Sequence, residues 1–218
     1  MQLAQVIHGT SGANTPLIVV HGLFGSARNW GAVAKRLSSD RRVIAVDLRN
    51  HGDSPWADAH DYLSMANDLA DVIAEHGGPV DVIGHSMGGK AAMMLSLTRP
   101  ELVRRLLVAD IAPVVYGHTQ RPFVAAMQAL DLDAIASRAA ADAALSDTID
   151  DPGVRAFLLQ SLDLRADPPR WRLNLAALDD QMDEIIGWPT DVQDQFSGPV
   201  LFLSGARSDY VQTVHRPA

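Results

Sequence analysis

The sequence predicts an α/β fold, in which a mostly parallel sheet carries helices on both of its faces. Short apolar runs rich in β-branched residues alternate with longer stretches at helical spacing, and turn residues bound most of them. Hydrophobic residues make up 47% of the 218 residues, which is enough for a sizeable core. Strands separated by helices need crossover connections, and these generate parallel sheets. The alternation therefore indicates the fold class.

The expected strands are short and almost wholly apolar, as strands covered on both faces are. Between the expected strands 42–46 and 80–83, apolar residues recur at helical spacing from Tyr62 to Ile73, and Gly77 and Gly78 follow. This pattern predicts one helix with a glycine stop. The expected strands are residues 17–20 (LIVV), 42–46 (RVIAV), 80–83 (VDVI), 104–110 (RRLLVAD) and 199–205 (PVLFLSG).

Residues 114–196 have a different character. They are rich in Ala, Leu, Asp and Arg at helical spacing, show no strand pattern, and are divided into short helices by "DDPG" and "ADPP". Because a strand pattern returns after them, we interpret 114–196 as a helical cap inserted between a core of residues 1–113 and a resumed core of residues 197–218. The alternative is a second, independent helical domain.

Composition excludes several classes of function. The formal net charge is −8 and no basic stretch occurs, so a nucleic-acid partner is not expected. The absence of cysteine excludes disulfides, thiolate catalysis and cysteine metal sites. We find neither a secretory signal nor an apolar run long enough to span a membrane, so a cytoplasmic location is expected. The oligomeric state cannot be read from the sequence.

The residues Gly84-His85-Ser86-Met87-Gly88 carry the pattern G-x-S-x-G, directly after an expected strand and before the helical stretch "KAAMMLSLTR". A change from strand to helix within one residue forces the serine into a strained backbone conformation and needs small neighbours. Such a turn lifts a hydroxyl above the carboxyl ends of the strands, where open sheets bind ligands. The context favours Ser86 as a nucleophile over a chance match in a structural turn.

A second segment, "VVHGLFGS" (19–26), supports this interpretation. It is a strand that ends in His-Gly and runs into a loop. The tetrahedral intermediate of acyl transfer carries a negative oxygen, which needs two preorganised N–H donors. We expect Met87 to supply one donor and Leu23 the other, with Phe24 as the alternative to Leu23.

"HGLFGS", "DLRNHGDSP" (47–55), "GHSMGGKAAM" (84–93) and "VADIAP" (108–113) together resemble the α/β-hydrolase superfamily. More narrowly they are similar to its YbfF-like small acyl esterases and thioesterases. The resemblance implies a triad of serine, acid and histidine, a helical cap that roofs an acyl pocket, and no metal or organic cofactor. In the cap, the side chains expected to face an acyl group include Phe123, Met127, Phe157 and Trp171.

Two aspartates are candidates for the triad acid. Asp110 ends the strand after the nucleophile's helix, and Asp209 follows the strand 199–205. The subgroup resemblance favours Asp110, with Asp209 as the alternative acid. The base is harder to place, because this fold carries its histidine on a loop after the last strand. His215 is the one histidine after both aspartates, but its position indicates a following helix. We therefore expect the true base, with a final strand and helix, beyond Ala218.

The expected function is that of a serine hydrolase, which cleaves carboxylic ester or thioester bonds of small acyl substrates through an acyl-enzyme. One alternative is another serine-dependent reaction on the same fold, such as lactone or C–C bond hydrolysis. The other is a catalytically inactive member that binds acyl ligands or a protein partner.

Overall fold

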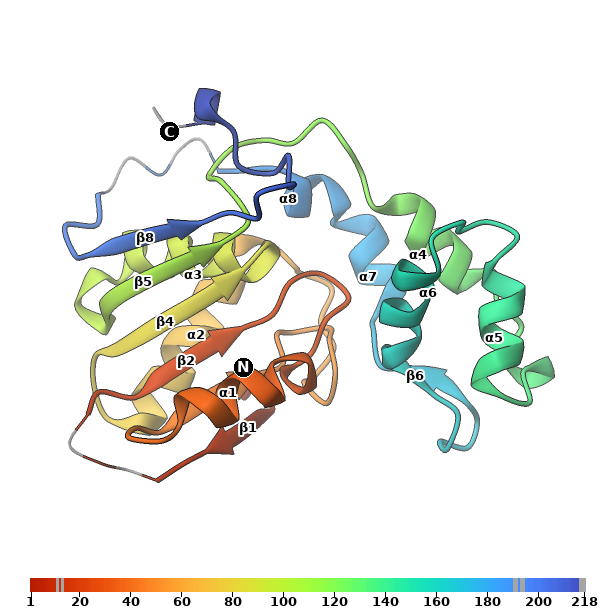
Figure 1. Cartoon of the computed structure of the whole chain (residues 1–218), viewed down its shortest axis with the longest axis horizontal. Coiled ribbons are helices and arrows are strands. Elements are labelled where there is room, and N and C mark those ends of the chain that lie inside the picture. The colour runs from red at the N-terminus through yellow and green to blue at the C-terminus, as the bar shows by residue number, and fades with distance from the viewer. Residues whose placement is uncertain (11, 13, 190–191, 193–194, 216–218) are drawn as a thin grey trace.

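Within the residues that the structure describes, six strands form one sheet in the order β1-β3-β2-β4-β5-β8 (Figure 1). The structure is a computed structural model and describes residues 1–10, 12, 14–189, 192 and 195–215. Strand β1 runs antiparallel to β3, and the other neighbours are parallel. The strands are β1 Gln5–His8, β2 Leu17–Val20, β3 Val43–Val46, β4 Val80–His85, β5 Val103–Ala109 and β8 Val200–Leu203.

The five expected strands are confirmed, and β1 is an addition to them. Its two aliphatic residues, Val6 and Ile7, are 40% and 50% exposed. A half-exposed antiparallel edge strand therefore leaves neither a continuous apolar run nor an alternation over four residues. By contrast, every residue of β2 and β3 is buried, and this is the pattern that the sequence displays.

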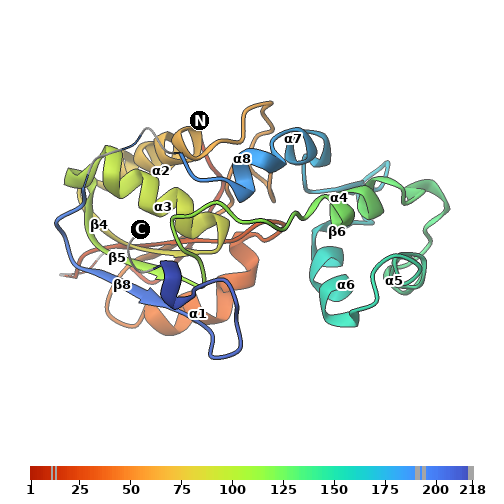
Figure 2. The same ribbon diagram turned by 90° about the horizontal axis from the view of Figure 1, so that it is seen from above.

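Helices cover both faces of the sheet (Figures 1 and 2). Helix α1 (Gly31–Leu37) lies on one face, and α2 (Tyr62–His76) and α3 (Met87–Thr98) lie on the other. Asp61 caps the start of α2, where its carboxylate accepts a hydrogen bond from the Ser64 N–H, and Gly77 caps its end in the left-handed conformation. The larger apolar core fills the space between the sheet and α2 and α3 and continues into the segment between β5 and β8, and a smaller cluster lies under α1.

The cap occupies the interval between β5 and β8. Helices α4 to α6 project beyond the carboxyl ends of the strands, and α7 and α8 lead back toward α3 (Figure 2). The expectation of a purely helical cap was wrong, because β6 (Leu162–Asp163) and β7 (Arg170–Trp171) form a short hairpin. Two-residue strands are too short for a period-2 pattern. The boundaries at 114 and 196 stay a prediction.

The cap helices are α4 Arg121–Gln128, α5 Arg138–Leu145, α6 Pro152–Leu158, α7 Leu175–Asp180 and α8 Met182–Ile186. The short 3₁₀ turns of the described residues are η1 Ala27–Trp30, η2 Pro100–Leu102, η3 Leu132–Ala134, η4 Leu159–Ser161 and η5 Thr213–His215.

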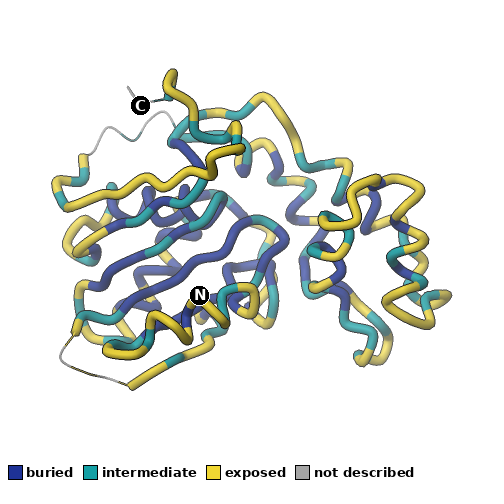
Figure 3. Tube along the Cα trace, in the orientation of Figure 1, coloured by how far each residue is buried: buried dark blue, intermediate teal, exposed yellow. Residues whose placement is uncertain are grey.

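Strand β8 lies at the outer edge of the sheet and is poorly covered (Figure 3). It pairs with β5, yet its four apolar residues are all exposed. The strand therefore adds backbone pairing and little buried apolar surface. In the described part of the chain, no helix has both the length and the apolar character that crossing a bilayer requires.

Candidate active site

The predicted nucleophile, oxyanion loop and acid follow three neighbouring strands. Leu23 follows β2, Ser86 follows β4, and Asp110 follows β5. Because these strands are parallel neighbours, their carboxyl ends meet at one edge of the sheet. The chain leaves β2 toward β3 and returns to β4 on the opposite side of β2, so this edge includes the point where strand order reverses. Open α/β sheets bind ligands at such a point.

Ser86 occupies a strained turn between β4 and α3. Its φ of 51° and ψ of −124° lie in a region that non-glycine residues rarely adopt. The Ser86 N–H donates to the Ala109 carbonyl at 2.9 Å, which ties the turn to β5. A Cβ atom on Gly88 would lie 2.3 Å from the His21 carbonyl oxygen, so only glycine fits there. This is the geometry that exposes a serine hydroxyl at the top of a sheet.

The loop after β2 packs against the nucleophile. A Cβ atom on Gly22 would lie 3.1 Å from Cβ of Ser86. The Phe24 N–H donates to Nε2 of His51 at 3.2 Å, whereas the Leu23 N–H has no acceptor among the described residues. Met87 is the first residue of α3, and an N–H at that position has no partner within its helix. The contacts therefore favour Leu23 and Met87 over Phe24 as donors to an oxyanion.

A stack of three buried histidines supports this loop from below. The ring centroids of His21 and His51 are 5.1 Å apart, and those of His51 and His60 are 5.4 Å apart. Burial lowers the pKa of His21 to about 4 and that of His51 to about 3, and it also lowers the pKa of His60 well below its usual value. All three imidazoles are therefore neutral near pH 7.

Hydrogen bonds assign the tautomers of the first two rings. Nε2 of His21 accepts from the Leu48 N–H at 2.9 Å, so its Nδ1–H donates to the Gly22 carbonyl at 2.8 Å. In the same way, Nε2 of His51 accepts from Phe24, and its Nδ1–H donates to the Arg49 carbonyl at 2.9 Å. Both nitrogens of each ring are therefore hydrogen-bonded to backbone groups. Sequence reasoning did not find His60 as a third member of this stack, because the ring contact forms only in the fold.

Asp110 lies between the strained turn at Ser86 and the loop after β8. Its φ is 58°, a second strained position beside the site. One carboxylate oxygen accepts from the Gly205 N–H at 3.1 Å and the other accepts from the Ser208 hydroxyl at 2.9 Å. Asp209 is exposed, and its backbone carbonyl accepts a hydrogen bond from the Gln212 side-chain amide at 3.0 Å. The structure thus places Asp110, and not Asp209, beside the turn that carries Ser86.

The described residues place no histidine base in this arrangement. Nδ1 of His215 accepts from the Gln212 N–H at 3.2 Å, and its ring lies 6.0 Å from that of Tyr116. His118 forms a 3.0 Å hydrogen bond with the Tyr210 hydroxyl. Among the described residues, no imidazole is hydrogen-bonded to Ser86 or to Asp110. The described residues also contain no cluster of three side chains that could hold a metal ion.

A sequence profile described as the alpha/beta hydrolase family matches residues 17–218. The chain belongs to this family. The hydrolase is 42% identical over 213 residues to the sn-1-specific diacylglycerol lipase ABHD11 of Mus musculus. The aligned region covers 93% of the hydrolase and 69% of the lipase. The hydrolase is 38% identical over 206 residues to the esterase YbfF of Escherichia coli (strain K12), which covers 93% and 78% of the two chains. A solved structure titled "Marine microorganism esterase" superposes with a TM-score of 0.93 at 37% identity, over 99% of the hydrolase and 85% of that chain. The resemblance and the fold class are confirmed.

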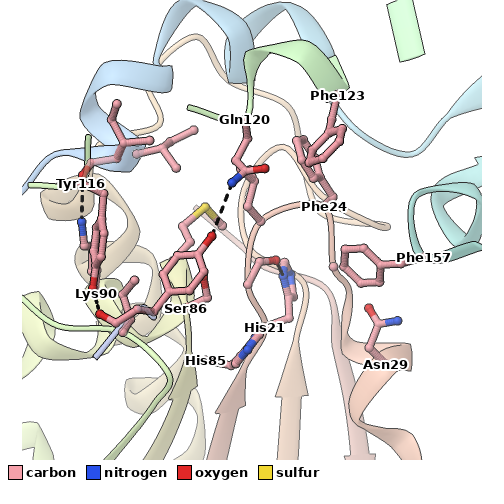
Figure 4. Close-up of a pocket in the computed structure, with 18 of the residues that line it drawn as sticks. His21, Phe24, Asn29, His85, Ser86, Lys90, Tyr116, Gln120, Phe123 and Phe157 are labelled. Carbon is pink, nitrogen blue, oxygen red and sulfur yellow. Dashed lines mark hydrogen bonds between the residues drawn. The ribbon is translucent and has the colours of Figure 1, made fainter. Parts of the chain in front are cut away.

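The hydrolase has a cavity of about 570 Å³ directly over Ser86 (Figure 4). Phe123 and Phe157 line it from the cap, as expected, but Met127 and Trp171 do not. Trp171 instead donates its indole N–H to the Met127 carbonyl at 3.0 Å inside the cap. The described lining residues include no Asp, Glu or Arg, so the walls are mostly apolar. Besides the two phenylalanines, the lining includes Leu23, Phe24, Trp30, Val33, Tyr62, His85, Met87, Lys90, Ile111, Tyr116, His118, Gln120, Val154, Leu158, Ile185, Ile186 and Tyr210.

Proposed function

We propose that this hydrolase cleaves carboxylic ester bonds of uncharged acyl substrates through a covalent acyl-enzyme on Ser86. One observation carries the proposal. A serine in a strained turn between strand and helix lies at the floor of an apolar cavity, beside two N–H groups that have no acceptor among the described residues. The names of its relatives, an esterase and a diacylglycerol lipase, support ester hydrolysis.

The reaction follows from this arrangement. The Ser86 hydroxyl attacks the ester carbonyl carbon, and a base takes its proton. The N–H groups of Met87 and Leu23 stabilise the negative oxygen of the tetrahedral intermediate, with each donor contributing about 3 kcal/mol. The bond to the leaving alcohol then breaks as the base returns the proton. Water attacks the acyl-enzyme by the same route and releases the carboxylic acid.

The cavity supports an uncharged acyl group. It lacks Asp, Glu and Arg in its described lining, and its one lysine, Lys90, donates its ammonium hydrogens to backbone carbonyls. A charged acyl chain would be desolvated there without a partner, at a cost of several kcal/mol. The volume of about 570 Å³ lies in the range of small-molecule sites. Thioesters share the acyl half, so they form a second substrate class to test.

Asp110 is the proposed acid of the triad, because its carboxylate lies at the end of the strand beside the nucleophile. Its role is to orient the imidazole and to stabilise the imidazolium. We propose that this imidazole comes from a histidine outside residues 1–218, since none of the eight histidines is hydrogen-bonded to Ser86 or Asp110 among the described residues. A cytoplasmic location stays a prediction from the sequence.

The test is Ser86→Ala in the natural polypeptide, with Ser39→Ala as a control at an exposed serine after α1. We expect Ser86→Ala to lower p-nitrophenyl butyrate hydrolysis by about 10⁴-fold or more and to abolish fluorophosphonate labelling, because the nucleophile is lost. Ser39→Ala should retain both. Labelling without ester or thioester turnover, but with lactone opening, would assign the alternative hydrolysis. Absence of labelling in the parent protein would leave an inactive binding protein and refute the proposal.

A further inference from the structure

Lys90 is a buried cation that the proposed reaction does not use. It lies on α3, one helical turn after Ser86, and only 1% of its surface is exposed. In the described part of the chain its ammonium donates to three backbone carbonyls, those of Val114 at 2.9 Å, Ile186 at 3.1 Å and Gly187 at 2.5 Å. The number of acceptors matches the three hydrogens of an ammonium group.

The three acceptors lie at the two connections between the core and the cap. Val114 is where the chain leaves the core after β5, and Ile186 and Gly187 are where α8 ends and the chain returns. The Tyr116 N–H donates to the Ile186 carbonyl at 2.9 Å, so the two connections also contact each other. Lys90 therefore joins both connections to α3, the helix that directly follows Ser86.

The energetics argue that this lysine has a role besides filling space. Its ammonium lies 4.8 Å from the ring centre of Tyr116 and 5.5 Å from that of Tyr62, and no carboxylate pairs with it among the described residues. Burial lowers the pKa of Lys90 to about 7, so the site opposes the charge. An apolar side chain of similar volume would avoid this desolvation cost. The carbonyls and rings repay part of it only while both connections stay in place.

The connections that Lys90 holds carry part of the cavity wall. Tyr116 and Ile186 line the cavity, and Lys90 lies on the same side of it as Tyr116 (Figure 4). The Tyr116 hydroxyl accepts from the Ala112 N–H at 2.9 Å and donates to the Tyr210 carbonyl at 2.6 Å. A shift of either connection would therefore move the wall relative to Ser86.

We propose that Lys90 is a positioning residue, which fixes the roof of the acyl cavity over Ser86 by holding both connections of the cap to the nucleophile's helix. The inference rests on the proposed function for its substrate. A long acyl chain must fill the roofed part of the cavity, whereas an acetyl group needs only Ser86 and the oxyanion donors. Loss of Lys90 should therefore weaken the use of long acyl esters selectively.

The experiment compares Lys90→Met with Lys35→Met in the natural polypeptide. Lys35 is the chain's other lysine and is exposed on α1. For Lys90→Met we expect KM for p-nitrophenyl octanoate to rise about tenfold or more, while KM for the acetate changes by less than about threefold. Amide hydrogen exchange gives a readout without turnover. The Tyr116 amide should exchange about tenfold faster or more, with the Ser86 amide as reference.

Each outcome decides the proposal. Equal losses on octanoate and acetate that follow a fall in Tm, with unchanged Tyr116 exchange, would show a purely structural role and overturn it. If Lys90→Met does not fold, Lys90→Gln takes its place, since it keeps two donors without the charge. Its KM for p-nitrophenyl octanoate should rise above that of the parent protein, by less than the rise of about tenfold expected for Lys90→Met. An unchanged KM would refute the inference. If the parent protein lacks esterase activity, the proposed function fails. The exchange of the Tyr116 amide then still tests whether Lys90 holds the two connections of the cap in place.

Discussion

The histidine stack beneath the oxyanion loop should make this protein sensitive to mild acid. His21 and His51 are neutral when folded, with pKa values of about 4 and about 3, against 6.5 for a free imidazole. Between those values the unfolded chain binds protons that the folded chain does not, so the free energy of unfolding falls as the pH falls. The stabilisation is complete above pH 6.5 and is lost as the pH decreases toward 4 and 3.

The magnitude follows from the pKa differences. Each pKa unit corresponds to about 1.4 kcal/mol, and at pH 5 an imidazole that titrates at 6.5 in the unfolded chain has taken up nearly a full proton. Between pH 7 and pH 5, each of the two histidines should therefore remove about 2 kcal/mol, or about 4 kcal/mol together. His60 acts in the same direction. Asp47, whose pKa burial raises, acts in the opposite direction. A loss of this size is a large share of a typical domain stability of about 5–15 kcal/mol.

The assay is urea unfolding of His51→Gln at pH 7 and pH 5, followed by circular dichroism. Glutamine cannot be protonated, and its carboxamide oxygen can still accept from the Phe24 N–H. We expect its loss of stability between the two pH values to be smaller than that of the parent protein by about 2 kcal/mol. His118→Gln, at an exposed ring, should behave like the parent protein. An identical loss in His51→Gln and the parent would refute the claim that this ring is buried and neutral.

Two further predictions concern the acid of the triad and the glycine of the turn at Ser86. Asp110→Asn should lower kcat/KM for p-nitrophenyl butyrate by about 10³-fold to 10⁴-fold, because the imidazole loses its orienting carboxylate, and Asp209→Asn should change it only a few-fold; the reverse ranking in the same assay would move the acid to Asp209. Gly88→Ala places a Cβ atom 2.3 Å from the His21 carbonyl, so urea unfolding should show a loss of about 3 kcal/mol. Gly31→Ala, whose Cβ meets no atom within 4 Å, should be neutral or slightly stabilising, and equal effects of the two substitutions would contradict the close approach at Gly88.

The sequence by itself determined the class of the fold and the places where chemistry can occur. Buried parallel strands are short apolar runs, and the strained turn at Ser86 needs its glycines next to it in the chain, so both are visible locally. The sequence also puts Leu23, Ser86 and Asp110 directly after expected strands, and the parallel pairing of these strands brings the three residues to one edge.

Only the tertiary structure decided the features that depend on partners far apart in the chain. That the Phe24 N–H already donates to a side chain depends on His51, which lies 27 residues away in the chain. The three-carbonyl contact of Lys90 involves residues up to 97 positions away, and no local pattern records it. The edge strand β1 and the hairpin of the cap left no signal either, because β1 is half-exposed and the two-residue strands of the hairpin are too short for a period-2 pattern.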